Sequence, residues 1–171
     1  MENETIVEYV TLKNEKKIIK LSKETTKLYL SDLSIVSIKG LDSLTKLTEL
    51  DVSKNFLSSI ALPDSLIEFD CSDNAFECLD NLPLKLRILE CSDNKIKSLD
   101  YLPGELYSLI CWGNKIRSLD KLPKRLVILD CEDNPIKTLN HLPDTIDDLT
   151  FGEEQNAAIP EFVKLTYVGT F

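Results

Sequence analysis

Few residues of this chain have the types and spacing that catalysis needs. His141 is the only histidine, and it directly precedes Leu142 and Pro143 at a predicted turn. A general base needs neighbours that tune its pKa, so a histidine at an isolated turn position is better explained as a solvated side chain. The sequence contains no glycine-rich phosphate loop and no nucleophile elbow. We therefore predict no enzymatic activity and no cofactor; activity would require His141 or Cys78 in a cleft beside a perturbed neighbour.

Metal binding is the next chemistry that the residue types allow. Asp130, Glu132 and Asp133 carry the carboxylate oxygens that a hard cation prefers, but no calcium-loop pattern with its glycine surrounds them. The cysteines lack the C-x-x-C spacing that brings thiolates together on a zinc ion. We therefore expect no metal site.

The cysteines indicate a core. The chain has five, and four of them are spaced 20 residues apart: Cys71, Cys91, Cys111 and Cys131. An odd number, with four at one repeated inward-facing position, does not suit a disulfide framework. Free cysteine is among the most buried residue types, so we predict a buried column with neighbours about 4.8 Å apart. Cys78 lies outside this column, and the sequence leaves its exposure open.

The cysteine spacing is part of a repeat that covers most of the chain. Counting from Leu106 as position 1, apolar residues fall at positions 1, 4, 6, 11 and 14, and Asn114 is at position 9. The prolines Pro63, Pro83, Pro103, Pro123 and Pro143 keep the same spacing, as do Asn74, Asn94, Asn114 and Asn134. Two earlier units, around Leu28 and Leu47, run slightly off this period.

These residues resemble the leucine-rich repeat family, whose L-x-x-L-x-L-x-x-N/C-x-L core forms a strand and a turn in each unit. The Leu-Pro-x-x-Leu opening and the 20-residue period are similar to the bacterial subclass of IpaH- and YopM-type effectors. The resemblance covers about residues 25 to 160, in about seven units. It implies a solenoid with a curved parallel β-sheet on the concave side. The convex side would hold extended or turn segments with little or no α-helix.

Physical reasoning supports the same architecture. One unit cannot bury its apolar side, so it needs neighbours on both faces. The position 9 asparagines should stack into a ladder that satisfies the backbone where the chain leaves each strand. The repeated prolines favour an extended return limb.

Both ends of the chain are predicted to be caps. Residues 1–24 combine an alternating apolar stretch with a lysine-rich stretch, which favours a hairpin-like strand pair over the first repeat. A short amphipathic helix is the alternative. Residues 161–171 follow Pro160 and are predicted to form a capping strand.

The candidate binding residues follow from the alternation of side chains along a strand. If positions 4 and 6 point inward, positions 3 and 5 point outward on the concave face, with positions 7 and 8 beside them. The apolar residues there are Ile88, Ile110, Trp112 and Ile128, with Tyr107 at their margin. The acids around them are Glu68, Asp70, Glu90, Asp93, Asp130, Glu132, Asp133 and Asp148. An apolar cluster ringed by carboxylates suits a protein interface, although coverage by a cap or ordinary scattered surface would also explain it.

Charge suggests the kind of partner. The net charge is -9, and the sequence places most of it on the concave face, opposed by a basic edge that includes Lys95, Lys115 and Arg125. Such a face would attract a basic protein and would repel the phosphates of nucleic acid. A solvated acidic face without a partner is the alternative. The resemblance implies protein recognition by the concave face, without the ligase domain of IpaH-type proteins.

Three functional hypotheses therefore remain at the sequence level. The first is a protein-interaction module that binds a basic partner; the second is a self-associating structural or scaffold protein. The third is a repeat-only, effector-like protein that acts on host proteins. No apolar run approaches the ~20 residues that span a bilayer, and the acidic start does not resemble a secretory signal. We expect a cytoplasmic protein with reduced cysteines, and delivery into a host cell stays open.

Overall fold

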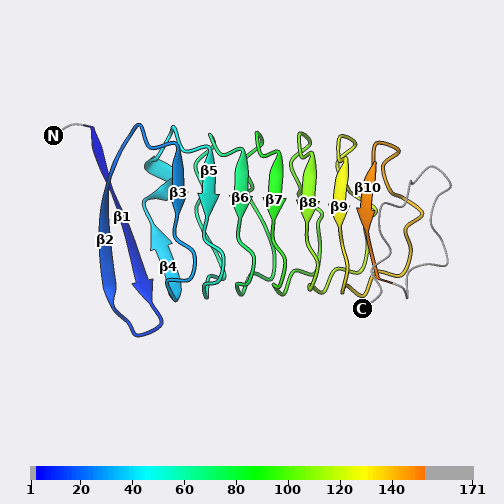
Figure 1. Ribbon diagram of the computed structural model, residues 1–171, viewed down its shortest axis with the longest axis horizontal. Coiled ribbons are helices and arrows are strands. Elements are labelled where there is room, and N and C mark those ends of the chain that lie inside the picture. The colour runs from blue at the N-terminus through cyan, green and yellow to red at the C-terminus, as the bar shows by residue number, and fades with distance from the viewer. Residues whose placement is uncertain (1–2, 153–171) are drawn as a thin grey trace.

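The repeats form one long parallel sheet in the computed structural model, which describes residues 3–152. Each unit contributes a strand of three residues (Figure 1). These strands are β3 (Lys27–Tyr29), β5 (Glu49–Asp51), β6 (Glu68–Asp70), β7 (Ile88–Glu90), β8 (Ser108–Ile110), β9 (Ile128–Asp130) and β10 (Asp148–Thr150). Their order is β10-β9-β8-β7-β6-β5-β3, and every neighbouring pair is parallel. The predicted parallel sheet is confirmed.

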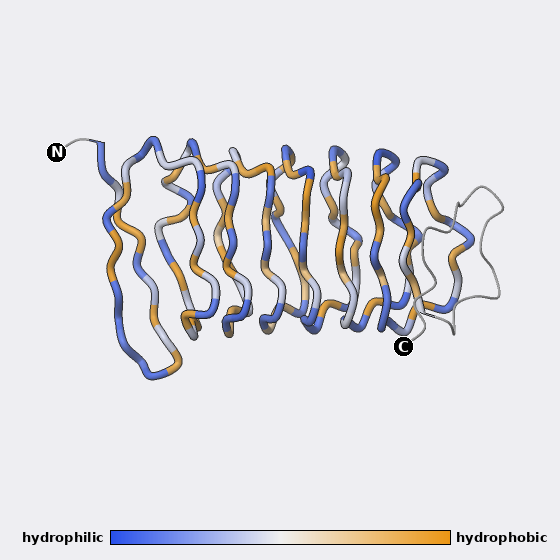
Figure 2. The backbone as a smooth tube through the Cα atoms, in the orientation of Figure 1, coloured by the Kyte–Doolittle hydropathy of each residue, from blue (hydrophilic) through white to orange (hydrophobic). Residues whose placement is uncertain are grey.

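The register explains the 20-residue period. The central residues of adjacent strands pair with one another, as Leu89 does with Leu109 and Leu109 with Leu129. Each of these leucines is buried, and together with positions 1, 6, 11 and 14 they form one hydrophobic core along the solenoid. Figure 2 shows hydrophobic residues recurring from turn to turn. Because a unit buries this face only against its neighbours, the core is a stack of equivalent layers.

The position 9 asparagines form the predicted ladder. The Asn94 side-chain amide donates to the carbonyl oxygens of Cys71, in the preceding unit, at 2.9 Å, and of Cys91, in its own unit, at 3.2 Å. It also donates to Ser92 O, and its Oδ1 accepts the Phe76 backbone N–H at 2.9 Å. The same pattern recurs at Asn55, Asn74 and Asn114. Each asparagine therefore satisfies buried backbone groups of two units.

A second backbone rule applies at position 8. Lys54, Asp73, Asp93, Gly113 and Asp133 occupy it, and all have φ between 49° and 67°. Short polar side chains and glycine tolerate this left-handed conformation better than most residues do. At Gly113 a Cβ would also lie 2.5 Å from Asp93 Oδ1, so a larger residue there would require the exposed Asp93 side chain to move.

The return limbs contain almost no helix within residues 3–152. The exception is the 3-10 turn η1 (Leu41–Ser43), which follows Gly40. A Cβ at Gly40 would lie 2.3 Å from Ile6 O, because the N-terminal hairpin packs closely there. The prediction of little or no α-helix is confirmed. No helix in the described part of the chain is long and apolar enough to cross a membrane.

The N-terminal residues form a hairpin. Strand β1 (Glu4–Thr11) pairs antiparallel with β2 (Lys16–Ser22) and, on its other side, with β4 (Ile35–Lys39). Val7 of β1 is fully buried against the first repeat. The strand pair is therefore observed in place of the alternative amphipathic helix. The domain limits at 24 and 160 stay predictions, and the capping strand predicted at 161–171 lies outside the described residues.

The cysteine column is buried as predicted. Cys71, Cys91, Cys111 and Cys131 are buried and form no disulfide, whereas Cys78 is exposed. Burial raises the pKa of each column thiol, in Cys131 to about 12. The column thiols are therefore protonated and shielded, as expected for core residues.

Candidate protein-binding face

The side chains at positions 3 and 5 of the seven strands form what we call the outer sheet face. Strand register places the position 3 residues in one row: Lys27, Glu49, Glu68, Ile88, Ser108, Ile128 and Asp148. The position 5 row is Tyr29, Asp51, Asp70, Glu90, Ile110, Asp130 and Thr150. All are exposed or half-buried except Ser108, which is 8% exposed. Ser108 keeps its place in the outward row, but its small side chain is covered by its larger neighbours.

The N-terminal half of this face contains a depression that we call the acidic hollow. Its volume is about 220 Å³. The lining residues are Tyr29, Glu49, Leu50, Asp51, Glu68, Phe69, Asp70, Ile88 and Glu90. Lys27 Nζ lies 2.5 Å from Glu49, and the Tyr29 hydroxyl donates to the same carboxylate. These two donors lower the pKa of Glu49. Glu49 is therefore ionised, and Lys27 already balances its negative charge.

The other acids differ in what they do for the fold. Asp70 Oδ1 accepts the N–H of Ser72 at 2.9 Å, and Asp51 makes the equivalent bond in its own unit. These aspartates therefore stabilise the turn after the strand. The Glu90 carboxylate forms no hydrogen bond or ion pair within the described residues, although the Glu90 backbone carbonyl accepts the Cys71 N–H at 2.8 Å. Burial, then repulsion by Asp70 and Asp51, raises the pKa of Glu90.

The predicted apolar residues lie on β7 to β9 and the turn after β8, and we call them the apolar patch. Ile110 pairs with Glu90 and Asp130, while Ile88 and Ile128 flank Ser108 in the other row. Ile110 is therefore a diagonal neighbour of both Ile88 and Ile128, which lie on either side of Ser108, and no two of the three are directly paired. Trp112 is 37% exposed and follows Ile110 by two residues.

Tyr107 is 42% exposed and lies at the amino end of β8. It lines a second depression of about 220 Å³ together with Ile67, Glu68, Arg87 and Ile88. Ile88 borders both this depression and the acidic hollow. Tyr107 therefore lies at the amino end of β8, whereas Trp112 follows the carboxyl end of the same strand.

The remaining predicted acids lie beyond the patch. Asp93 and Asp133 are exposed at position 8, on either side of Gly113. Burial, followed by repulsion from Asp73 and Asp133, raises the pKa of Asp93. Asp130 is half-buried, and burial raises its pKa although it accepts the N–H of Glu132 at 3.2 Å. Glu132 is half-buried, and Asp148 is exposed on the last described strand.

Ser92, at position 7, is 3% exposed, and its Oγ has no hydrogen-bond partner in the structure. The equivalent Ser53 hydroxyl donates to Asp51 at 2.6 Å. Position 5 of the Ser92 unit is Glu90 where the two preceding units have aspartate. Within the described residues the Glu90 carboxylate makes no bond to the Ser92 N–H that corresponds to the bond between Asp70 and the Ser72 N–H.

Comparison with solved structures places this geometry among known proteins. YopM from Yersinia enterocolitica WA-314 is 33% identical with a TM-score of 0.60, over 71% of this chain and 28% of that chain. A Shigella effector leucine-rich repeat domain is 27% identical with a TM-score of 0.62, over 80% and 62%. The chain is a leucine-rich repeat solenoid of the bacterial type. It spans less than two thirds of either structure.

A third structure, the functional domain of InlJ from Listeria monocytogenes, is 25% identical with a TM-score of 0.47, over 88% of this chain and 43% of that chain. No protein-family model matches the chain, and no curated protein sequence does. The similarities to YopM and to the Shigella domain nonetheless support a repeat module of the protein-interaction type.

Sequence reasoning missed part of this solenoid's outer face. Tyr29, Glu49 and Asp51 line the acidic hollow but belong to the two units that run off the 20-residue period. The signal was present, because the alternation around the buried Leu28 and Leu50 places their neighbours outward.

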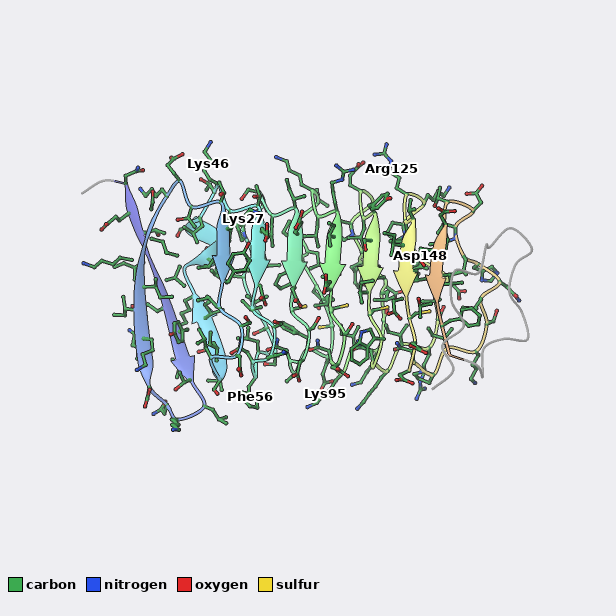
Figure 3. All side chains as sticks on the ribbon, in the orientation of Figure 1. Lys27, Lys46, Phe56, Lys95, Arg125 and Asp148 are labelled. Carbon is green, nitrogen blue, oxygen red and sulfur yellow. The ribbon has the colours of Figure 1, made fainter. Side chains whose placement is uncertain are left out.

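The predicted basic edge is wrong as a single feature. Lys95 and Arg125 lie at opposite ends of the strands, and Lys46 lies on the same side as Arg125 (Figure 3). Several cations pair with an acid of the preceding unit, including Lys97 with Glu77 at 2.6 Å. The cations therefore lie at both ends of the strands of the leucine-rich repeat sheet, because each unit has one loop before its strand and one loop after it.

The residues considered for catalysis lie away from the outer sheet face. His141 is exposed, and its Nδ1 is 2.6 Å from Asp120 Oδ1, at the same place in the solenoid as the Lys121 to Asp100 pair one unit earlier. Cys78 donates a hydrogen bond to Asp80. Within residues 3–152 no group of three or more histidine, cysteine, aspartate and glutamate side chains has an arrangement that could hold a metal ion.

Proposed function

We propose that this leucine-rich repeat solenoid is a protein-interaction module whose outer sheet face binds a basic protein. The observation that carries the proposal is the contrast between positions. The buried positions repeat from unit to unit, whereas the outward positions vary and combine an acidic hollow with an apolar patch.

Both parts of the face suit an interface. Trp112 and Tyr107 offer aromatic area of the kind that dominates binding energy when a partner excludes water from it. The surrounding carboxylates would attract a basic partner, accelerating association more than deepening affinity. The same carboxylates would repel nucleic acid.

The test is a capture experiment on lysate of the source cell, with the wild type, Trp112→Ala and a control variant side by side. Tyr101→Ala is the matched control, because Tyr101 is 76% exposed but lies on a return limb. We expect a basic protein that is lost with Trp112→Ala and with added salt, and retained with Tyr101→Ala. Equal capture by all three proteins would reject the assignment of the face.

Self-association is the competing use of the same apolar patch. In that case Trp112→Ala would convert an oligomer into a monomer. Light scattering on the purified wild type decides this, because a monomeric wild type excludes the patch as a contact between copies.

An effector-like role is a second candidate, and the similarity to the Yersinia and Shigella proteins favours it. The partner would then be a host protein. Capture from host-cell lysate and from source-cell lysate distinguishes the two settings. Either setting agrees with our proposal of a cytoplasmic protein with reduced cysteines.

A further inference from the structure

The two parts of the outer sheet face follow each other in a fixed order along the solenoid. The acidic hollow extends over strands β3 to β7, and the apolar patch extends over β7 to β9 and the turn after β8. Ile88 belongs to both. A ligand that crosses the strands therefore meets carboxylates at one end and apolar side chains at the other.

Glu90 lies where the two parts meet. It neighbours Asp70 on one side and Ile110 on the other. Unlike Asp70, its carboxylate makes no hydrogen bond to the turn of its own unit within the described residues. The exposed carboxylate of Glu90 therefore has no hydrogen-bonding role in the fold of its unit.

Glu90 is also held in an unfavourable electrostatic setting. Burial, followed by the negative charges of Asp70 and Asp51, raises the pKa of Glu90, and no cation contacts its carboxylate within the described residues. Lys27, the cation at this end of the face, is already bound to Glu49. A positively charged group from a partner would relieve this repulsion.

We infer that the occupant of the outer sheet face is one continuous basic segment of a protein, with an arginine or lysine side chain in the acidic hollow against Glu90 and an apolar side chain on the patch beside Trp112. This inference rests on the proposed function and adds the composition and the direction of the ligand. Charge complementarity supports the basic end, and the exposed tryptophan supports the apolar end.

The strand spacing sets the distance between the two side chains. A cation over β6, between Asp51 and Glu90, and an apolar side chain over β8 are two strands apart, which is ~10 Å. About three residues of a polyproline-type extended segment, or about seven of a helix, cover that distance and keep both side chains on one side. The number of residues between the basic and the apolar residue of a bound segment therefore indicates whether the segment is extended or helical.

The experiment selects short random peptides on the immobilised wild-type protein and then measures the affinity of the selected peptides. We expect enriched peptides with a basic and an apolar residue at one of these spacings. Glu90→Gln should weaken them roughly tenfold, and Trp112→Ala should weaken them at least as much. Glu77→Gln is the matched control, because it removes the same charge from an acid paired with Lys97 away from this face, and affinity should stay within about twofold.

Three results would overturn the inference. They are enriched peptides without a basic residue, peptides insensitive to Glu90→Gln, and a selection that enriches nothing. None of them rejects the proposed function, because a folded partner could cover the face with several segments. The proposed function fails separately, when capture of a partner protein is indifferent to Trp112→Ala.

Discussion

The asparagine column and the outer sheet face run along the same solenoid and follow the same register, yet they differ in sequence. Asn55, Asn74, Asn94 and Asn114 are chemically identical and make the same hydrogen bonds. The outward rows change from carboxylate to isoleucine to serine between neighbouring strands. A solenoid needs its inner positions to be alike because each layer packs on the next, and it leaves the outer positions free for binding.

The largest expected difference between the buried positions and the exposed positions is in the reactivity of their thiols. In the native protein only Cys78 should react with a thiol reagent, because the other four are buried. The hydrogen bond to Asp80 raises the pKa of Cys78 as well, so its exposure makes the difference. All five should react in denaturant. Counting thiols with a chromogenic disulfide at slightly alkaline pH checks this. Fast native reaction of Cys91 would show that the core opens locally.

The asparagine column can be disrupted by a substitution at its centre. Asn114→Ala removes the donor to the carbonyls of Cys91 and Cys111 and the acceptor for the Ile96 N–H. Leaving these buried groups unpaired should destabilise the protein by about 3 kcal/mol. Urea unfolding measures the loss. Asn140→Ala, at an exposed position, should change stability by less than about 0.5 kcal/mol.

A substitution on the outer sheet face should weaken binding and leave stability nearly unchanged. Trp112→Ala should weaken partner binding by about 2 kcal/mol, as expected for an interface anchor, while the unfolding free energy changes by less than about 1 kcal/mol. Titration calorimetry with the captured partner, together with urea unfolding, gives both numbers. A stability loss as large as that of Asn114→Ala would place Trp112 in the core and remove the contrast.

The smallest expected effect concerns pH. The pKa of Glu90 is raised in the folded state above its ordinary value of 4.5, so the folded state holds this proton to higher pH than the unfolded chain does. Stability therefore falls as pH rises from about 4.5 through the raised pKa, and the penalty is complete at neutral pH.

Because Glu90 is exposed and solvent screens the repulsion on it, Glu90→Gln should remove only a small penalty and stabilise the protein at neutral pH by at most about 0.5 kcal/mol. The gain should disappear in acid, where the wild-type carboxyl is protonated. Glu77→Gln should show no such gain, because its ion pair with Lys97 lowers the pKa of Glu77. Thermal unfolding at acidic and neutral pH measures the difference, and a destabilising Glu90→Gln would mean that the carboxylate serves the fold.

The repeat spacing in the sequence was sufficient to predict the parallel sheet, the asparagine ladder and the buried cysteine column. Each follows directly when the same residue occupies the same position of every 20-residue unit and the units stack. The site was predicted less completely, because it depends on neighbours in adjacent layers. Ser108 shows this, since its burial follows from the size of the side chains around it.

By itself, the sequence determined which residues of each unit point inward, because the period of 20 residues and the alternation along a strand are local properties. Only the tertiary structure decided how the units align across the sheet. That alignment brought Tyr29, Glu49 and Asp51 to the acidic hollow, left Glu90 without a structural role, and divided the cations between two edges. The physical reason is that charges and side-chain volumes act across strands, over distances that the repeat pattern of one chain segment does not contain.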